Sequence, residues 1–280
     1  MISVIIISDR PEYFGAIEKN IAVTIGVPFQ LIHVKDSRSG ICFGYNRGAG
    51  KAKYDVLCFV HDDVLFHTGG WGKAVAAHLQ ESGTALIGVM GGRYKSANGL
   101  TWRDGATAAH RYQVKDGKEA GKILLHNPHN ESKSRVLCLD GAFMCCRKNV
   151  WAQFNFDEKT FTGFHFYDAD FCMQVAKSYS NYVVYDILIE HFSQGSINKA
   201  FIEDSFKFEH KWKSDLPYAI DPLTKKQIIQ LEGYTLAEKL KYMDDAGFKR
   251  SERWTLIKKY FHRFRNLYHL IRSSYFGVLK

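Results

Sequence analysis

Residues 54–64 read Tyr-Asp-Val-Leu-Cys-Phe-Val-His-Asp-Asp-Val, and they are the most informative stretch about the fold. Residues 55–60, which are all apolar after Asp55, predict an interior β-strand, because an uninterrupted apolar run rich in β-branched and aromatic residues is typical of a strand buried on both faces. The strand ends at His61-Asp62-Asp63. Ligands of parallel sheets bind beyond the carboxyl ends of the strands, so this polar triplet is the first candidate site.

Working outward from this strand, apolar β-rich runs alternate with helical patterns. We expect further strands over 2–7, 29–34 and 85–90, and helices over 13–25, 43–53 and 71–81. Such alternation predicts βαβ units and a mainly parallel central sheet, the α/β class. The length of 280 residues suits one or two domains.

The second half of the chain is less regular. Between 91 and 131 the alternation of strand and helix patterns is lost, and Gly, Lys, Asn and His are frequent, which predicts a long functional loop. Strands over 136–139 and 141–147, a helix after Asp168 and a strand over 182–189 follow.

Three polar groups stand at expected element ends and could carry chemistry. Asp62 and Asp63 offer carboxylate oxygens suited to Mg²⁺ or Mn²⁺, although a solvated turn with a helix cap would use the same residues. Asp168 and Asp170 lie in an aromatic setting that favours a perturbed pKa, as a general base needs, or one of them caps the next helix. His191 could ligate a metal, with Ser196 near phosphate, or could be structural.

Several familiar sites are excluded. The sequence has no Gly-x-Gly-x-x-Gly after a strand, no Gly-x-Ser-x-Gly and no His-Glu-x-x-His, and Ala52 stands where a phosphate loop needs Ser or Thr. The six cysteines form no Cys-x-x-Cys pair and lie mostly in apolar runs, which predicts buried free thiols. With no signal peptide and no spanning apolar run, we expect a cytoplasmic protein.

The combination resembles the GT-A-fold glycosyltransferases of the family-2 type, over roughly residues 1–215. The resemblance rests on Ser3-Val-Ile-Ile-Ile-Ser, Asp36-Ser37 and the stretch from Gly44 to Asp63, followed by Leu139-Asp-Gly-Ala-Phe-Met, Tyr167-Asp-Ala-Asp and His191-x-Ser-x-Gly-Ser. It implies a GT-A, Rossmann-like fold, a nucleotide-sugar donor that is most often UDP-linked, and a Mn²⁺ or Mg²⁺ ion.

The resemblance also implies roles for individual residues. Asp63 and His191 would hold the metal, and Asp168 would deprotonate the acceptor hydroxyl in an inverting transfer. The donor side would be formed by Ser8, Asp36, Asn46, Asp62, Asp140, Gly141 and Ser196.

Two positions depart from the family pattern. His61 stands where the first Asp of Asp-x-Asp is usual, and Tyr167 replaces the Glu of a Glu-Asp pair. A non-catalytic nucleotide-sugar-binding protein and a sugar-phosphate nucleotidyltransferase therefore remain alternatives. The Gln-x-x-Arg-Trp signature of processive synthases is absent, which favours transfer of a single sugar to a glycan or lipid-linked acceptor.

Basic charge is concentrated at the C-terminus. The net charge is +9, yet 249–280 holds nine basic residues and one acid, which leaves 29 basic and 28 acidic residues elsewhere. We expect 216–280 to form a helical, basic amphipathic extension with Trp254, Ile257 and Phe261 on its apolar face. This face could pack on the domain or a partner subunit, including a second copy, or lie on the inner face of a membrane. No nucleic-acid-binding motif is present.

Overall fold

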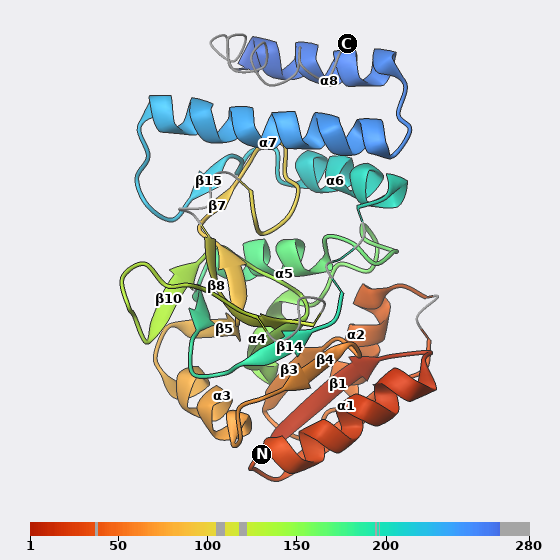
Figure 1. The fold of residues 1–280 in the computed structure, drawn as a ribbon, viewed down its shortest axis with the longest axis vertical. Coiled ribbons are helices and arrows are strands. Elements are labelled where there is room, and N and C mark those ends of the chain that lie inside the picture. Colours follow the sequence, from red (N-terminus) through yellow and green to blue (C-terminus); the bar gives the residue numbers. More distant parts are fainter. Residues whose placement is uncertain (37–38, 105–109, 118–121, 194, 196, 264–280) are drawn as a thin grey trace.

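The computed structural model describes residues 1–36, 39–104, 110–117, 122–193, 195 and 197–263. Figure 1 shows a sheet-and-helix body that carries the N-terminus, and a stack of three helices at the opposite end. The fold class expected from the sequence, α/β of the GT-A type with a C-terminal helical extension, is confirmed.

A seven-stranded sheet forms the centre of the body. Its order is β10 (Lys133–Val136), β13 (Ser180–Val184), β5 (Thr84–Gly88), β12 (Phe143–Arg147), β3 (Val56–Val60), β1 (Ile2–Ile7) and β2 (Phe29–Val34). Pairs β1–β2, β1–β3 and β13–β5 are parallel, while β12 runs antiparallel between β3 and β5, and β10 is antiparallel to β13. Five of the seven strands therefore share one direction, as a mainly parallel sheet requires.

The helices of the body pack on this sheet through their apolar sides. They are α1 (Pro11–Thr24), α2 (Ile41–Gly50), α3 (Trp71–Gln80), α4 (Lys148–Phe154) and α5 (Tyr167–Ala176). The glycine-rich stretch in α2 allows the helix to approach β1 closely: a Cβ on Gly44 would lie 2.6 Å from Ile7 and one on Gly48 2.4 Å from Ile5. These glycines therefore serve helix–strand packing.

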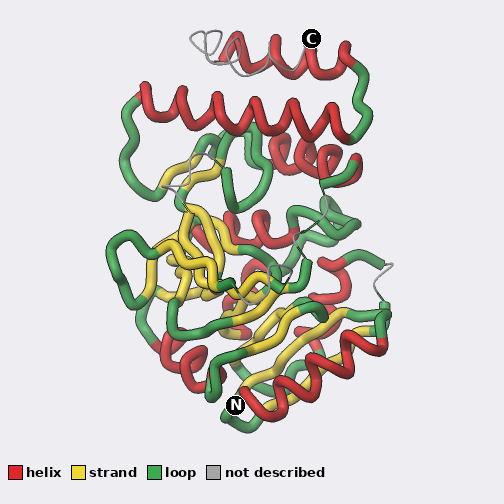
Figure 2. The backbone as a smooth tube through the Cα atoms, in the orientation of Figure 1, coloured by secondary structure: helices red, strands yellow, loops and turns green. Residues whose placement is uncertain are grey.

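A second sheet occupies the stretch that the sequence presented as a long loop. Its order is β11 (Cys138–Leu139), β6 (Met90–Gly92), β8 (His110–Asp116), β14 (Ile189–His191) and β4 (Val64–Phe66), with β9 (Ile123–His126) paired to β8 (Figure 2). The expectation of a loop over all of 91–131 was wrong, because these short strands are supported by pairing with distant β4 and β14 rather than by a local pattern.

The extension stacks on one end of the body. Helices α6 (Lys199–Lys211), α7 (Lys225–Asp245) and α8 (Arg250–Arg263) lie in sequence at the top of Figure 1, and β15 (Tyr218–Ala219) pairs with β7 (Tyr94–Lys95). Leu236 and Leu240 of α7 belong to the same buried cluster as the central sheet. The buried core thus continues from the body across residue 215 into the extension.

Helix α8 packs on the protein along a different side from the one expected. Leu256 and Tyr260 are buried, whereas Trp254 is 39% exposed. Ile257 is partly buried against the core, and the expected apolar face beyond 263 lies outside the described residues. None of the helices in the described part of the chain is long and apolar enough to cross a membrane.

Candidate active site

The site is assembled where strands of both sheets end. Strand β1 leads into Ser8 and Arg10, β3 leads into His61-Asp62-Asp63, and β14 ends at His191. The first two ends lie side by side because β1 and β3 are parallel neighbours, and β14 reaches them through its pairing with β4, which begins directly after Asp63. Segments nearly 200 residues apart in the sequence thereby meet.

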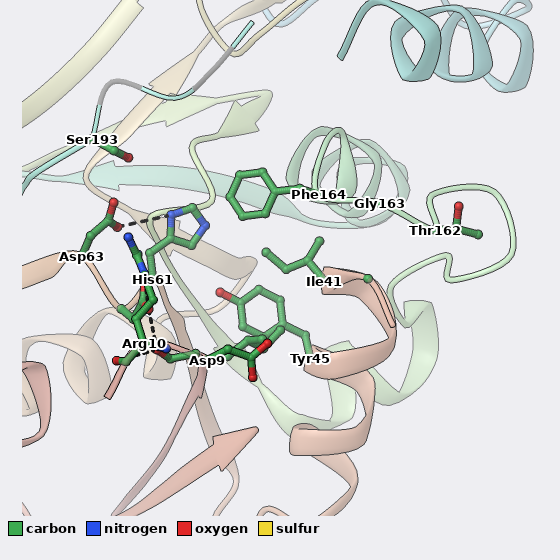
Figure 3. Close-up of a pocket in the computed structure, with 14 residues that line it drawn as sticks. Asp9, Arg10, Ile41, Tyr45, His61, Asp63, Thr162, Gly163, Phe164 and Ser193 are labelled. Atoms are coloured by element: carbon green, nitrogen blue, oxygen red, sulfur yellow. Dashed lines mark hydrogen bonds and ion pairs between the residues drawn. The ribbon is translucent and has the colours of Figure 1, made fainter. Parts of the chain in front are cut away.

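His61, Asp63 and His191 form a cluster of potential metal ligands. One ligand atom from each lies within 4.8 Å of the other two. Asp63 Oδ1 is 3.5 Å from His191 Nε2. It is 4.0 Å from His61 Nδ1, and a dashed line marks this pair in Figure 3. Atoms that bind one ion at about 2.1 Å lie up to about 4.2 Å apart, so a small closing movement would bring all three onto one divalent ion. Two imidazoles and a carboxylate are ligands that transition metals accept.

The charges of this cluster favour a deprotonated carboxylate. Burial opposes ionisation of Asp63, but its hydrogen bond with His191 holds its pKa well below the usual range. Burial and the neighbouring His191 lower the pKa of His61, which keeps that ring neutral and able to ligate. Burial also acts against protonation of His191, yet its bond to Asp63 and nearby carboxylates raise its pKa.

Asp62 faces away from this cluster. It accepts hydrogen bonds from the Ser8 hydroxyl and from Arg10, whose Nε lies 3.1 Å from Oδ2 and whose Nη2 bonds Oδ1. The Asp62 carboxylate raises the pKa of Arg10 further, through a hydrogen bond that outweighs burial. The two adjacent aspartates therefore make separate contacts: Asp63 lies with the two histidines, and Asp62 bonds to the chain after β1.

A cavity of about 340 Å³ opens beside the cluster. Figure 3 shows His61 between Asp63 and Phe164, whose ring centre is 5.6 Å from that of His61 and whose side chain is 53% exposed. The cavity is lined by Ile7, Ser8, Asp9, Arg10, Gly40, Ile41, Tyr45, His61, Asp62, Asp63, Thr162, Gly163, Phe164 and Ser193.

Asp168 and Asp140 lie together on the side of the site formed by α5 and β11. Asp168 accepts hydrogen bonds from the backbone N–H groups of Gly141, at 3.1 Å, and Ala169, at 2.8 Å. Burial and the negative charge of Asp140 raise the pKa of Asp168 to about 6, despite these two bonds. Such a carboxyl is ionised at neutral pH and is basic enough to accept a proton.

Neither aspartate of α5 is a side-chain cap of that helix. The helix begins after Phe166, which has a left-handed φ of 64° and makes no capping bond. Asp170 instead accepts bonds from Trp212, Lys211 and Gln174, and so it has a structural role. Asp168 remains the candidate base.

Tyr167 links the base side of the site to the metal cluster. Its hydroxyl and His61 Nε2 are 2.6 Å apart. A Cβ on Gly141 would lie 1.8 Å from that hydroxyl, so only glycine at 141 leaves room for it. This contact could not be predicted from the sequence. His61 was not among the expected metal ligands, although histidine next to two carboxylates is itself a metal-ligand signal.

Asn46 and Asp36, two of the expected donor-side residues, are not among the residues that line the cavity. The Asn46 amide is fully engaged: it donates to Phe156 O and Glu158, and it accepts from Trp151 and the Phe156 N–H. Asp36 accepts two bonds from Ser39 and is not among the cavity residues. Ser196 lies outside the described residues. All six cysteines are buried and free, as expected.

Solved structures share this fold at low sequence identity. The chain aligns with GalNAc-T7 crystallised with UDP, GalNAc and Mn²⁺ at a TM-score of 0.55 and 10% identity, covering 98% of this chain and 58% of that one. It aligns with S. aureus TarS 1-349 in complex with UDP-GlcNAc at a TM-score of 0.54 and 13% identity, covering 92% and 78%. The chain thus spans little more than half of the GalNAc-T7 chain.

Two comparisons concern sequence. No curated protein matches the chain. The family model described as "Glycosyltransferase like family" matches residues 3–211, which include every described residue placed at the site above. The protein therefore belongs to this glycosyltransferase-like family.

Proposed function

We propose that the protein transfers a single sugar from a nucleoside-diphosphate donor, with UDP favoured, to a hydroxyl group of an acceptor. The observation that carries this proposal is the convergence of His61, Asp63 and His191 beside a cavity, with Asp168 linked to them through Tyr167. Family membership and the UDP-GlcNAc complex of TarS, which has the same fold, support the choice of reaction and donor.

The metal cluster would hold one divalent ion, Mn²⁺ or Mg²⁺. Its two imidazoles favour Mn²⁺, since imidazole suits transition metals better than Mg²⁺, and GalNAc-T7 was crystallised with Mn²⁺. When bound, the ion supplies positive charge that neutralises the departing nucleoside diphosphate. Asp63 and His191 hold it as the resemblance implied, and we add His61 to the ligand set.

Asp168 acts in this proposal as the general base. As the acceptor oxygen attacks the anomeric carbon, its proton passes to the Asp168 carboxylate, and the bond from the anomeric carbon to the diphosphate oxygen breaks. Attack from the side opposite the leaving group inverts the configuration. The two backbone N–H groups that bind Asp168 fix its direction, which keeps the base pre-organised for proton transfer.

The donor would lie along the cavity. We place the nucleoside toward Ser8 and Asp36 at the ends of β1 and β2, and the sugar toward Asp140 and Gly141. Asp62 contributes by holding Arg10 and Ser8 in place. The exposed Phe164 ring offers an apolar face at the cavity, which suits the C–H face of a sugar ring of the acceptor.

A donor screen tests this function. Purified protein is incubated with Mn²⁺ and, in turn, UDP-GlcNAc, UDP-GalNAc, UDP-glucose and GDP-mannose, and free nucleotide is measured over time. We expect slow release of nucleotide from one UDP-sugar, and none from the Asp168→Asn variant. Tight binding of a UDP-sugar without turnover, with or without candidate acceptors, would favour the non-catalytic binding protein instead.

A further inference from the structure

Helices α7 and α8 hold one short piece of backbone in the catalytic body. Glu232 of α7 accepts a hydrogen bond from the Ala97 N–H at 3.1 Å, and Lys239 of the same helix donates to Asn98 O at 2.7 Å. Tyr260 of α8 donates to Ala97 O at 2.7 Å. All three side chains are completely buried. Helices α7 and α8 thus hydrogen-bond to the backbone of two consecutive residues, Ala97 and Asn98.

Residues 95–104 are joined to one another by buried polar contacts. Asp104 accepts hydrogen bonds from the N–H groups of Ser96, Leu100 and Thr101 at 2.9 to 3.1 Å, and it forms an ion pair of 3.0 Å with Lys95. Neither Lys95 nor Asp104 is exposed. Since breaking one of these contacts would leave a buried charge or N–H group unpaired, we treat residues 95–104 as one unit.

Trp102, near the end of this unit, reaches the active site. Its indole N–H donates to Asp140 Oδ2 at 2.6 Å, and the other oxygen, Oδ1, accepts from the Ala142 N–H at 2.8 Å. The Trp102 backbone also packs closely on Gly92: a Cβ at position 92 would lie 1.9 Å from the Trp102 carbonyl oxygen. Each oxygen of the Asp140 carboxylate thus accepts one hydrogen bond.

We propose that α7 and α8 help to order the active site. Through their hydrogen bonds to Ala97 and Asn98 they position Trp102, and Trp102 fixes the carboxylate of Asp140. Trp102 is a positioning residue in this arrangement. The inference deepens the proposed function and rests on it in one respect, the placing of Asp140 beside the transferred sugar.

Loss of the indole donor would release one oxygen of Asp140. The carboxylate could then rotate away from the sugar and change the negative charge that Asp168 experiences. The hydrogen bonds described above do not join Trp102 to His61, Asp63 or Ser8. Nucleotide and metal binding should therefore not change. The expected signature is therefore a fall in kcat without a change in nucleotide affinity.

The structural part is tested by the indole N–H signals in a two-dimensional nitrogen–proton spectrum of the full chain, with the Trp102 signal assigned from the Trp102→Phe variant. We expect Tyr260→Phe, and independently Lys239→Met, to move or broaden the Trp102 signal. Tyr234→Phe, on the exposed side of α7, is the matched control and should leave it unchanged. An unmoved Trp102 signal in folded Tyr260→Phe and Lys239→Met proteins would overturn the proposal.

The functional part uses donor turnover and calorimetric UDP affinity in the presence of Mn²⁺. We expect Trp102→Phe to lower kcat about 10-fold, the loss typical of a hydrogen bond to a charged group, with UDP affinity within twofold of wild type. Wild-type turnover in Trp102→Phe would overturn the positioning role. Failure of wild-type protein to bind UDP would instead count against the proposed function, and the indole signals would still test the coupling.

Discussion

The side chains of His61 and Tyr167 are joined by a hydrogen bond of 2.6 Å between Nε2 and the phenolic oxygen. These are the two positions at which the sequence departs from the usual pattern of the family it resembles. The bond leaves Nδ1 of His61 facing Asp63, so that a metal-bound ring would carry its proton on Nε2 and donate it to Tyr167. The two departures thus form one unit, in which Tyr167 orients a ligand that replaces a carboxylate.

Removal of the Tyr167 hydroxyl should weaken metal binding. We expect Tyr167→Phe to lower Mn²⁺ affinity about 10-fold, as loss of a hydrogen bond to a metal-binding histidine commonly does. Electron paramagnetic resonance of free Mn²⁺ measures this directly. Tyr179→Phe, after the same helix, is the control, since its hydroxyl donates to Gln153, at 3.5 Å. Equal Mn²⁺ affinity in all three proteins would contradict the orienting role.

The two adjacent aspartates should respond differently to substitution. Asp63→Asn removes the carboxylate shared by both histidines, and we expect it to abolish the effect of Mn²⁺ on UDP binding. Asp62→Asn breaks only the contacts to Ser8 and Arg10, so the variant should bind UDP more weakly, by about 10-fold, and still respond to Mn²⁺. The opposite assignment of the two effects would exclude Asp63 as the ligand.

The rate of transfer should depend on the ionisation of Asp168. Its pKa is raised to about 6, and the base acts only as a carboxylate, so kcat at saturating Mn²⁺ should rise through a midpoint near pH 6 and fall about tenfold per pH unit below it. Because the charge of Asp140 contributes to this rise, Asp140→Asn should move the midpoint to lower pH. A rate that is constant between pH 5 and pH 8 would show that another group takes the proton.

Membrane contact through the basic extension is open to a direct test. Arg250 and Lys258 lie on the exposed side of α8, whereas removing the helix would uncover the core around Leu256. We expect Arg250→Glu with Lys258→Glu to reduce association with phosphatidylserine vesicles about 10-fold. Lys19→Glu with Lys73→Glu, exposed on α1 and α3 and far from α8 in Figure 1, is the charge-matched control. Equal reductions in both proteins would indicate a non-specific charge effect.

The sequence predicted the parts of the fold whose stability is local or fully buried. Strands such as Ile2–Ile7 and Val56–Val60 are continuous apolar runs, and α2 is visible from its spacing. Strands β6 and β8 of the second sheet could not be predicted, because Met90–Gly92 is too short for a period to appear and His110–Asp116 is supported by pairing with β6, β9 and β14. The burial of Tyr260 was also missed, since its hydroxyl bonds to Ala97, more than 150 residues earlier.

The same distinction applies to the site. Asp63, His191 and Asp168 stand at element ends that the sequence marks, so they were candidates from the sequence. The contact of His191 with Asp63 depends on the antiparallel pair β14–β4, which the sequence does not predict. Tyr167 and Trp102 act through contacts to His61 and Asp140 that depend on side-chain geometry between distant segments. The contacts of Asn46 were likewise not predictable: its amide bonds to Trp151, Phe156 and Glu158, more than 100 residues later.

The central claim, that His61, Asp63 and His191 form a metal site for a nucleotide-sugar donor, is tested most directly by calorimetric titration of UDP and GDP, each with and without Mn²⁺. We predict that UDP binds in the presence of Mn²⁺, that GDP binds more weakly, and that Asp63→Asn abolishes the Mn²⁺ effect. Absence of binding by either nucleotide to folded wild-type protein, or UDP binding that Mn²⁺ does not change, would contradict the account.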